Sequence, residues 1–344
     1  MVHQNEQCDL LSAWRALDSQ KETEGWRTIA VFGSEFVKVL AGRHFPGNGE
    51  TILVGFPSIH VLSEIGLPEA HGFKTEKITT DIDDRFVSWV GLTRQEEGDL
   101  DLFAIMAFDI IHLLKESRQS SEKDLFRVFI SRILAWQNFM KRGKHRILSE
   151  EEETGLYGEL TVLETLLSDE MFFGTSVEKW DGPLEGIHDF NFGDWAIEVK
   201  STLANGNGFP AHIGGMDQLD TQSLRSLFLL GLRLRLASSG MNLPDKAKLI
   251  RKKICSLGML PDAYDSRLIS AGLAENDYEK YTRKFELVDT RYYNVVDDFP
   301  RLVRRNVRSE IRSLRYQLDL DMVPHTGNSI EQLLESIKGM KNES

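Results

Sequence analysis

The chain has 344 residues, of which 41% are apolar and 27% are charged, and its net charge at pH 7 is −12. This length suggests roughly two or three domains, and the composition excludes a collagenous, low-complexity or wholly disordered chain. Two cysteines are too few for a disulfide framework or a cysteine-rich zinc site, and the acidic balance argues against a general binder of polyanions.

Residues 1–146 are expected to form a β-plus-helical N-terminal domain. An opening helix is followed by short β-rich segments between turn signals, at 26–32, 51–56 and 85–92. Residues 100–141 change to helical periodicity, with one apolar stripe formed by Leu125, Phe129, Ile133, Trp136 and Met140. Most such stripes pack within their own domain, so we expect the same here. The domain is a candidate recognition or partner module.

A short basic segment at 141–146 marks the expected domain boundary, and a solvated linker explains its charge better than a phosphate-binding patch does. Ser149 and Glu152 fit a capping box, and the acidic residues around them suit the positive end of a helix dipole. A helix is therefore predicted to begin near residue 150. Its buried face would consist of Leu156, Leu160, Leu163 and Leu167.

Residues 177–201 are typical of two short strands joined by a turn at Gly193 and Asp194. A further strand is predicted from residue 226 to residue 236, where apolar residues alternate with arginine. Beyond it, residues 243–283 are expected to be helical and residues 285–296 extended.

The two strands at 177–201 also carry the pattern that indicates chemistry. In the second strand, Glu198 and Lys200 lie on the face opposite to the apolar residues, because side chains alternate between the faces of a strand. Burying charges there is costly unless they are paired or used. A tight turn would bring Asp189 beside Glu198, and a divalent cation would relieve the repulsion between the two carboxylates. Ligands that are all oxygen favour Mg²⁺ or Mn²⁺ over zinc.

The spacing of Asp189 and the segment Glu198-Val199-Lys200 resembles that of the PD-(D/E)XK nucleases. Glu159 matches an extra acidic residue that many of these nucleases carry on their first core helix. Gln218 lies where some members have a glutamine near the site, and we include it in the catalytic set. The proline that usually precedes the aspartate is His188 here, which leaves the metal ligands intact.

The longer pattern is similar to that of the PD-(D/E)XK motif proteins of bacterial defence gene clusters. This similarity rests on the segments 180–183, 188–190, 198–202 and 298–302. The resemblance implies an α/β fold whose restriction-endonuclease-like core, a mixed central sheet flanked by helices, occupies residues 147–238. A mostly helical C-terminal region would follow at 239–344.

The resemblance also implies metal-dependent hydrolysis of phosphodiester bonds. Asp189, Glu198 and the Val199 carbonyl would hold Mg²⁺, with Mn²⁺ as a substitute, and Glu159 would bind a second metal ion or position water. Lys200 would orient the attacking water or help to deprotonate it. The metal would generate the nucleophile and stabilise charge on the phosphoryl group. We therefore predict an Mg-dependent DNA endonuclease of bacterial restriction or phage defence.

An arginine-rich segment at 301–316 could supply the positive charge that the acidic chain otherwise lacks. Its arginines recur near helical spacing, and those predicted to bind nucleic acid are Arg301, Arg304, Arg305, Arg308 and Arg312. An equally weighted alternative is a solvated helix whose arginines pair with nearby carboxylates. Those carboxylates are Asp297, Asp298, Glu310 and Asp319.

Several expectations concern partners and location. DNA, other subunits of a defence gene cluster and a second copy of the chain are the expected partners, since cleavage of both strands needs two sites. The alternative function is a catalytically silent nuclease fold that binds DNA or assembles a complex, and RNA is a third candidate substrate. The first residues lack the pattern of a signal peptide, and no stretch approaches the roughly 18 apolar residues of a membrane helix. We expect a cytoplasmic protein without membrane contact.

Overall fold

The computed structural model describes residues 2–18, 24–60, 67–79, 82–141, 147–184, 186–203 and 208–342. The chain divides into two compact units, Met1–His145 and Arg146–Ser344. The basic residues at 142–146, which form most of the predicted linker, lie outside the described residues. None of the described helices combines the length and the apolar character that crossing a membrane would require.

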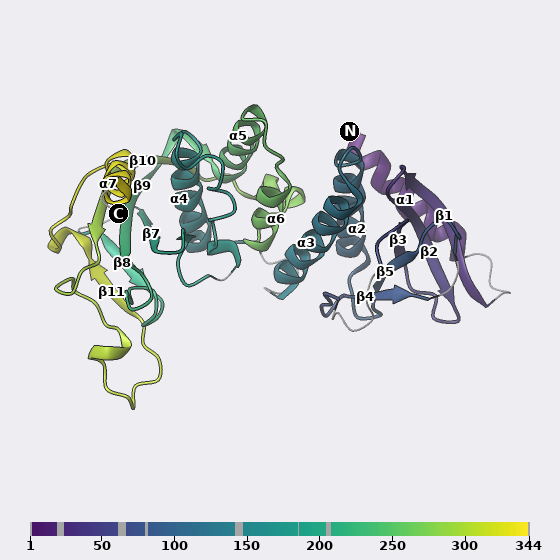
Figure 1. Cartoon of the computed structure of the whole chain (residues 1–344), viewed down its shortest axis with the longest axis horizontal. Helices are drawn as coiled ribbons and strands as arrows, with labels where there is room; N and C mark the ends of the chain where they lie inside the picture. The colour runs from purple at the N-terminus through teal and green to yellow at the C-terminus, as the bar shows by residue number, and fades with distance from the viewer. Residues whose placement is uncertain are drawn as a thin grey trace. The chain divides into compact units, whose positions relative to one another are not determined.

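The described residues of the first unit form a five-stranded antiparallel sheet and three helices (Figure 1). The strands follow the order β1-β2-β3-β5-β4 across the sheet. They are β1 (Gly25–Gly33), β2 (Lys38–Phe45), β3 (Thr51–Phe56), β4 (Phe73–Ile78) and β5 (Ser88–Arg94). The helices are α1 (Val2–Asp18), α2 (Leu100–Glu116) and α3 (Glu122–Lys141). The strands and helices predicted for this part of the chain are therefore confirmed.

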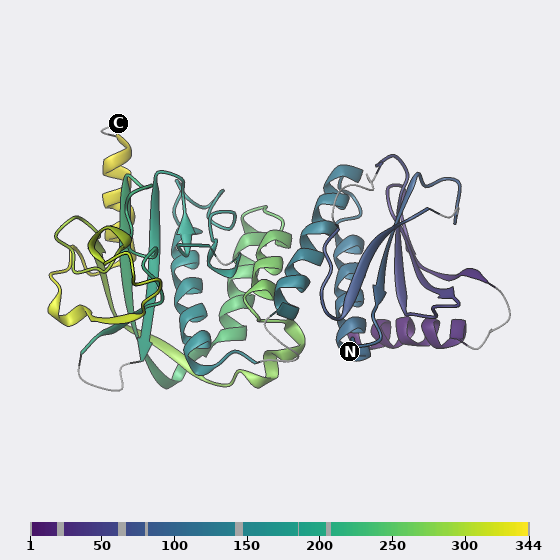
Figure 2. The same ribbon diagram turned by 90° about the horizontal axis from the view of Figure 1, so that it is seen from below.

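The helices of this unit pack on one face of its sheet (Figure 2). Trp14 of α1 donates its indole N–H to the Thr51 carbonyl oxygen at 2.9 Å and stacks on Phe103 of α2. Phe129 of α3 contacts Phe56 of β3, with ring centroids 5.9 Å apart. The apolar stripe of α3 is thus buried within its own unit, as the periodicity predicts.

The second unit is built on a four-stranded mixed sheet in the order β10-β9-β7-β6. Strand β7 (Trp195–Leu203) is antiparallel to β6 (Phe190–Asn191) and parallel to β9 (Ser226–Asn242), and β10 (Lys284–Asn294) completes the sheet as an antiparallel neighbour of β9. The predicted pair of strands at 177–201 and the strand from residue 226 are confirmed. A separate pair, β8 (Pro210–Ile213) and β11 (Tyr316–Asp319), lies against the opposite face from the helices.

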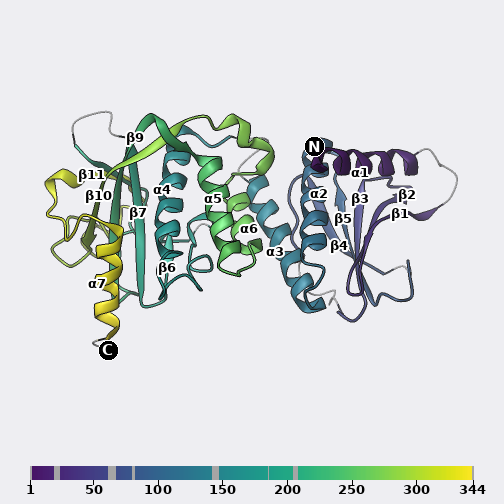
Figure 3. The same ribbon diagram turned by 90° about the horizontal axis from the view of Figure 1, so that it is seen from above.

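Helix α4 (Glu150–Leu166) packs on β7, and α5 (Leu243–Ser256) packs on α4 (Figure 3). The remaining helices of the unit are α6 (Asp262–Ser270) and α7 (Ile330–Asn342). The capping box is confirmed, because Ser149 Oγ accepts from the Glu152 N–H and Glu152 Oε2 accepts from the Ser149 N–H. The leucine-rich face of α4 is buried as predicted.

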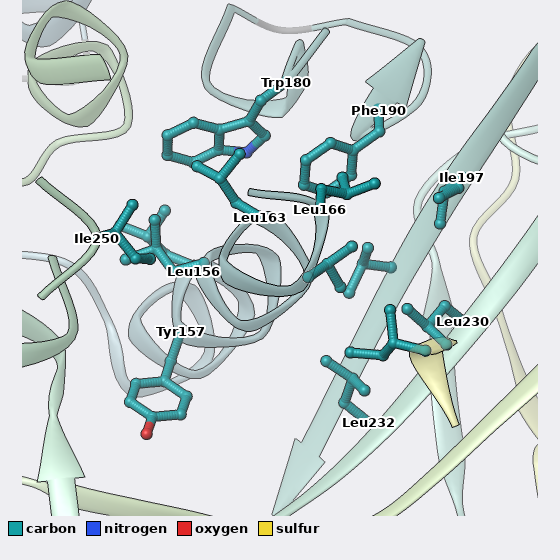
Figure 4. Close-up of a cluster of buried hydrophobic side chains, with 14 of the residues drawn as sticks. Leu156, Tyr157, Leu163, Leu166, Trp180, Phe190, Ile197, Leu230, Leu232 and Ile250 are labelled. Carbon is teal, nitrogen blue, oxygen red and sulfur yellow. The ribbon is translucent and has the colours of Figure 1, made fainter. Parts of the chain in front are cut away.

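Two apolar layers cover the two faces of this sheet. On the helix side, Leu156 and Leu163 of α4 lie between Ile250 of α5 and the strand residues Ile197 and Leu230 (Figure 4). The alternate residues of β9 face a second cluster that includes side chains around β8 and β11. A sheet covered on both faces explains why β9 begins with a continuous apolar run rather than a strict alternation. These results confirm the α/β, restriction-endonuclease-like core.

The expected organisation of the C-terminal region is wrong in two respects. Residues 239–344 are not a separate, mostly helical part, because β10 belongs to the central sheet and α7 packs in the same core as α4. The arginine-rich segment is not a helix either, since it contains only a three-residue 3₁₀ turn at Arg304–Asn306. Between residues 302 and 315 only Val303 is buried, so the segment lacks the apolar face that stabilises a helix by packing.

Candidate active site

Asp189, Glu198 and Lys200 come together where β6 pairs with β7 at one edge of the central sheet. Asp189 directly precedes β6, and its Oδ2 accepts a hydrogen bond of 2.7 Å from the Val199 N–H. On β7, Glu198 Oε1 lies 2.6 Å from Lys200 Nζ. Because they are two positions apart on one strand, Glu198 and Lys200 share a face, as the sequence predicts.

Glu159 reaches the same place from α4. Its Oε2 accepts a 2.7 Å hydrogen bond from the indole N–H of Trp180, which lies in the segment before β6. A Cβ added to Gly182 would lie 2.6 Å from Glu159 Oε2 and 2.9 Å from Asp189 Oδ1. The two carboxylates therefore converge on the backbone of Gly182, where any larger residue would push them aside.

The close approach of α4 to β7 depends on one glycine. A Cβ on Gly158 would lie 1.8 Å from Ser201 Oγ, whereas one on Gly155 would have no neighbour within 4 Å. Of the two glycines that precede Glu159 on this helix, only Gly158 is required by packing. It lets α4 lie close enough to the strand for Glu159 to reach the site.

Three carboxyl groups and one ammonium share a place shielded from water, so ionisation of all three carboxyl groups is costly. Burial, reinforced by the charge of Asp189, raises the pKa of Glu198 to about 8 and that of Glu159 well above its usual value. Burial also raises the pKa of Asp189, although Lys200 and the Val199 N–H oppose the shift. Burial lowers the pKa of Lys200, but Glu198 and Asp189 outweigh it, so the pKa is raised and the side chain is an ammonium at neutral pH.

This donor set fits a hard divalent cation. Glu198 Oε2 is buried and has no hydrogen-bond partner, so it leaves one oxygen lone pair unsatisfied beside the other carboxylates. All the acidic donors are oxygens, which suits Mg²⁺ or Mn²⁺. Among the described residues no three His, Cys, Asp or Glu side chains are already arranged as ligands. The set implied by the resemblance needs only two carboxylates together with the Val199 carbonyl.

A family model described as "Putative PD-(D/E)XK family member" (DUF4420) matches residues 10–321. The chain belongs to the DUF4420 family. The match extends over most of both units and confirms the resemblance to PD-(D/E)XK proteins, a class of nucleases that generally use divalent metals. No curated protein and no solved structure matches the chain.

Gln218 lies beside the lysine of the PD-(D/E)XK motif. Its Oε1 accepts a 2.7 Å hydrogen bond from the Gly214 N–H and lies 3.4 Å from Lys200 Nζ. The ring of His188, at the position of the motif proline, lies beside the backbone of Gln218. The glutamine of this DUF4420 member is thus brought to the site by the loop that follows β8.

The arginine-rich segment lies next to that loop, but its residues do not act alike. Arg301 is buried, with 7% of its surface exposed, and the prediction that it contacts phosphate is wrong because it is turned into the protein. Arg304 lies 3.7 Å from Asp217, and Arg305 lies 2.7 Å from Asp297. Arg308 and Arg312, the other two arginines predicted to bind phosphate, are exposed, as are Arg304 and Arg305.

Two structural parts of the site were not assigned a role from the sequence. Trp180 fixes Glu159, and Gly182 makes room for the carboxylates. The segment that carries them is held by Arg267 of α6, which donates to the carbonyl oxygens of Trp180 and Glu178 at 2.8 and 2.9 Å. The run Trp180-Asp181-Gly182 contributes to the family similarity, but a sequence does not reveal which side chain a buried indole will bond.

Proposed function

We propose that this chain is an Mg²⁺-dependent endonuclease that hydrolyses phosphodiester bonds in DNA. The observation that carries the proposal is the cluster of Asp189, Glu198 and Glu159 with one ammonium, Lys200, and an unsatisfied carboxylate oxygen. Membership of a PD-(D/E)XK family supports the same reaction class. A role in restriction or phage defence is proposed from the similarity of the longer pattern to proteins of defence gene clusters.

Each residue of the cluster has a role that its contacts support. Asp189, Glu198 and the Val199 carbonyl would hold the ion, with Asp189 oriented by the Val199 N–H. When bound, the ion would lower the pKa of a water molecule and offset charge on the phosphate. Lys200, held by Glu198, presents an ammonium that attracts the scissile phosphate and orients water. Glu159, fixed by Trp180, would bind a second ion or position water.

The exposed arginines near the Gln218 loop would bind the DNA backbone. They are Arg304, Arg305, Arg308 and Arg312. Each phosphate contact releases condensed counterions, so an Arg308→Ala variant should bind DNA more weakly and lower the salt-dependence slope of the affinity by about one. Fluorescence anisotropy over a range of salt concentrations measures this slope. An unchanged slope in a variant lacking all four arginines would reject the phosphate role.

A plasmid cleavage assay with Mg²⁺, Mn²⁺ or EDTA tests the proposed activity. Lys200→Ala should lower cleavage by at least about 10²-fold because it removes a charged donor at the reacting phosphate, yet it should still bind Mn²⁺. Asp189→Ala should lose both cleavage and Mn²⁺ binding, which calorimetry measures. Lys252→Ala, an exposed lysine on α5, is the matched control and should behave like the natural protein. Full cleavage by both site variants would refute the assignment.

The alternative is a catalytically silent nuclease fold that binds DNA within a complex. DNA binding without cleavage, under all metal conditions and with or without partner proteins, would support this alternative. Replacing the DNA with RNA in the same assay tests the remaining substrate. We also propose that the active form is a homodimer or a complex, which light scattering can test.

A further inference from the structure

Arg301 is the buried member of the arginine-rich segment, and its contacts point to a different role from that of its neighbours. Its side chain is only 2% exposed. One terminal nitrogen donates to the Leu219 carbonyl oxygen at 2.8 Å and to Thr221 Oγ1 at 3.2 Å. The other donates to Asp297 Oδ1 at 3.2 Å. All three acceptors belong to the protein, so three of the five N–H donors of this buried guanidinium are used inside the fold.

The backbone that Arg301 holds belongs to the loop that presents Gln218. Leu219 is completely buried, in the same apolar cluster as Phe299 and Val303 from the segment that carries Arg301. The ring of His188 lies beside the backbone of Gln218 in the same loop. Arg301 therefore holds the residue that directly follows Gln218, from a segment about 80 residues further along the chain.

We propose that Arg301 is a positioning residue that fixes the loop at 214–221 so that Gln218 stays within reach of Lys200. The link is short: Arg301 bonds Leu219, and Gln218 Oε1 lies 3.4 Å from Lys200 Nζ. The role of this arrangement in hydrolysis rests on the proposed function, whereas the fixing of the loop does not.

The choice of arginine follows from the geometry of the acceptors. A guanidinium is planar and can donate to several acceptors at fixed angles, whereas the ammonium of lysine is a point charge on a flexible stem. Arg301→Lys keeps the charge opposite Asp297 but cannot reach the Leu219 carbonyl and Thr221 in the same way. We expect the loop to loosen while the charge of the segment stays unchanged.

Hydrogen–deuterium exchange tests the fixing of the loop without any need for activity. In Arg301→Lys, amides at 214–221 should exchange at least about threefold faster, while those of β7 and β9 keep their natural rates. Thr221→Val removes one of the acceptors and should give a smaller change in the same direction. Arg235→Lys is the matched control, because that exposed arginine pairs with Glu286 on the neighbouring strand. Unchanged exchange at 214–221 in Arg301→Lys would overturn the proposal.

Kinetics on DNA test the link to Lys200. Arg301→Lys should lower kcat about tenfold with little change in KM, because a displaced group costs rate rather than affinity. In a Gln218→Ala background the same substitution should have little further effect. The salt slope of DNA affinity should stay as in the natural protein, in contrast to Arg308→Ala. The positioning role would be refuted if Arg301→Lys kept the kcat of the natural protein. It would also be refuted if the losses of kcat from Arg301→Lys and Gln218→Ala were fully additive in the double variant. If the natural protein cleaves no nucleic acid, the proposed function fails, and the exchange experiment still decides whether Arg301 fixes the loop.

Discussion

Each unit contains a buried glutamate, and the pKa values of these two side chains are shifted in opposite directions. Glu50 in the first unit is 6% exposed and Glu198 in the second is 1% exposed. Burial alone would raise the pKa of Glu50, but the hydrogen bond from Arg94 and the charges of Arg43 and Arg94 outweigh it, so the pKa is lowered. The pKa of Glu198 is instead raised to about 8, by burial and by its neighbour Asp189.

The difference lies in how many positive charges accompany each carboxylate. Glu50 Oε1 and Oε2 each meet an arginine, Arg43 at 2.7 Å and Arg94 at 2.6 Å. Glu198 meets a single lysine that it shares with two further carboxylates. The first arrangement neutralises its charge and supports the fold. The second has more carboxyl groups than cations, so their ionisation is costly in the metal-free protein, and a bound cation would relieve this cost.

The largest expected effect comes from removing the carboxylate charge of Glu50. Glu50→Gln should destabilise the first unit by about 3–5 kcal/mol, because the buried Arg43 and the half-buried Arg94 lose their counter-charge. Urea denaturation followed by tryptophan fluorescence measures the change. Glu97→Gln is the control, since that side chain is 73% exposed and its loss should change stability by less than about 0.5 kcal/mol. A loss below about 1 kcal/mol in Glu50→Gln would mean that the pairing does not support the fold.

A second test changes the geometry of the site without changing its charge. Gly158→Ala places a Cβ against Ser201, so α4 must shift, and we expect a loss of about 1–3 kcal/mol together with reduced cleavage, because Glu159 moves with the helix. Gly155→Ala meets open space and should stabilise the protein by up to about 1 kcal/mol through helix propensity.

Ser201→Ala sharpens this second test. Combined with Gly158→Ala, it removes the oxygen that the new Cβ would contact and should restore part of the stability and the cleavage. Thermal denaturation and the plasmid assay report the two effects separately. Equal stability of the two single glycine variants would show that the close approach of α4 to β7 is not required.

The sequence predicts the parts of the site that depend on local spacing. The alternation of β7 places Glu198 and Lys200 on one face, and the capping box fixes where α4 begins and therefore where Glu159 lies. These features follow from residues two to ten positions apart. The mixed sheet is also predicted, but only through the family resemblance.

The remaining features depend on contacts between distant residues. Arg301 bonds a carbonyl 82 residues earlier in the chain, and nothing in the repeated arginines distinguishes it from its exposed neighbours. Helical spacing of charged residues also misled the prediction, because a helix needs a buried face that Leu302 and Ile311, both exposed, do not provide. Residues 285–296 are likewise predicted to be extended, but the sequence does not show that β10 pairs with β9 and so joins the C-terminal region to the core.

The smallest expected effect concerns Glu159 in the second unit, a carboxyl group whose ionisation opposes folding. The pKa of Glu159 in the folded protein is well above the ordinary value of 4.5. The protonated carboxyl group therefore contributes its full stabilisation below pH 4.5, and this stabilisation is lost as the pH rises towards the pKa of the folded protein. Glu159→Gln removes this dependence, while its side-chain oxygen can still accept from Trp180. In EDTA, the variant should match the natural protein at pH 4.5 and exceed it by about 1 kcal/mol at pH 8, or about 2–4 °C in melting temperature. Glu151→Gln, exposed on the same helix, is the control. A pH profile in Glu159→Gln that parallels the natural one would show that this carboxyl is not destabilised by its neighbours.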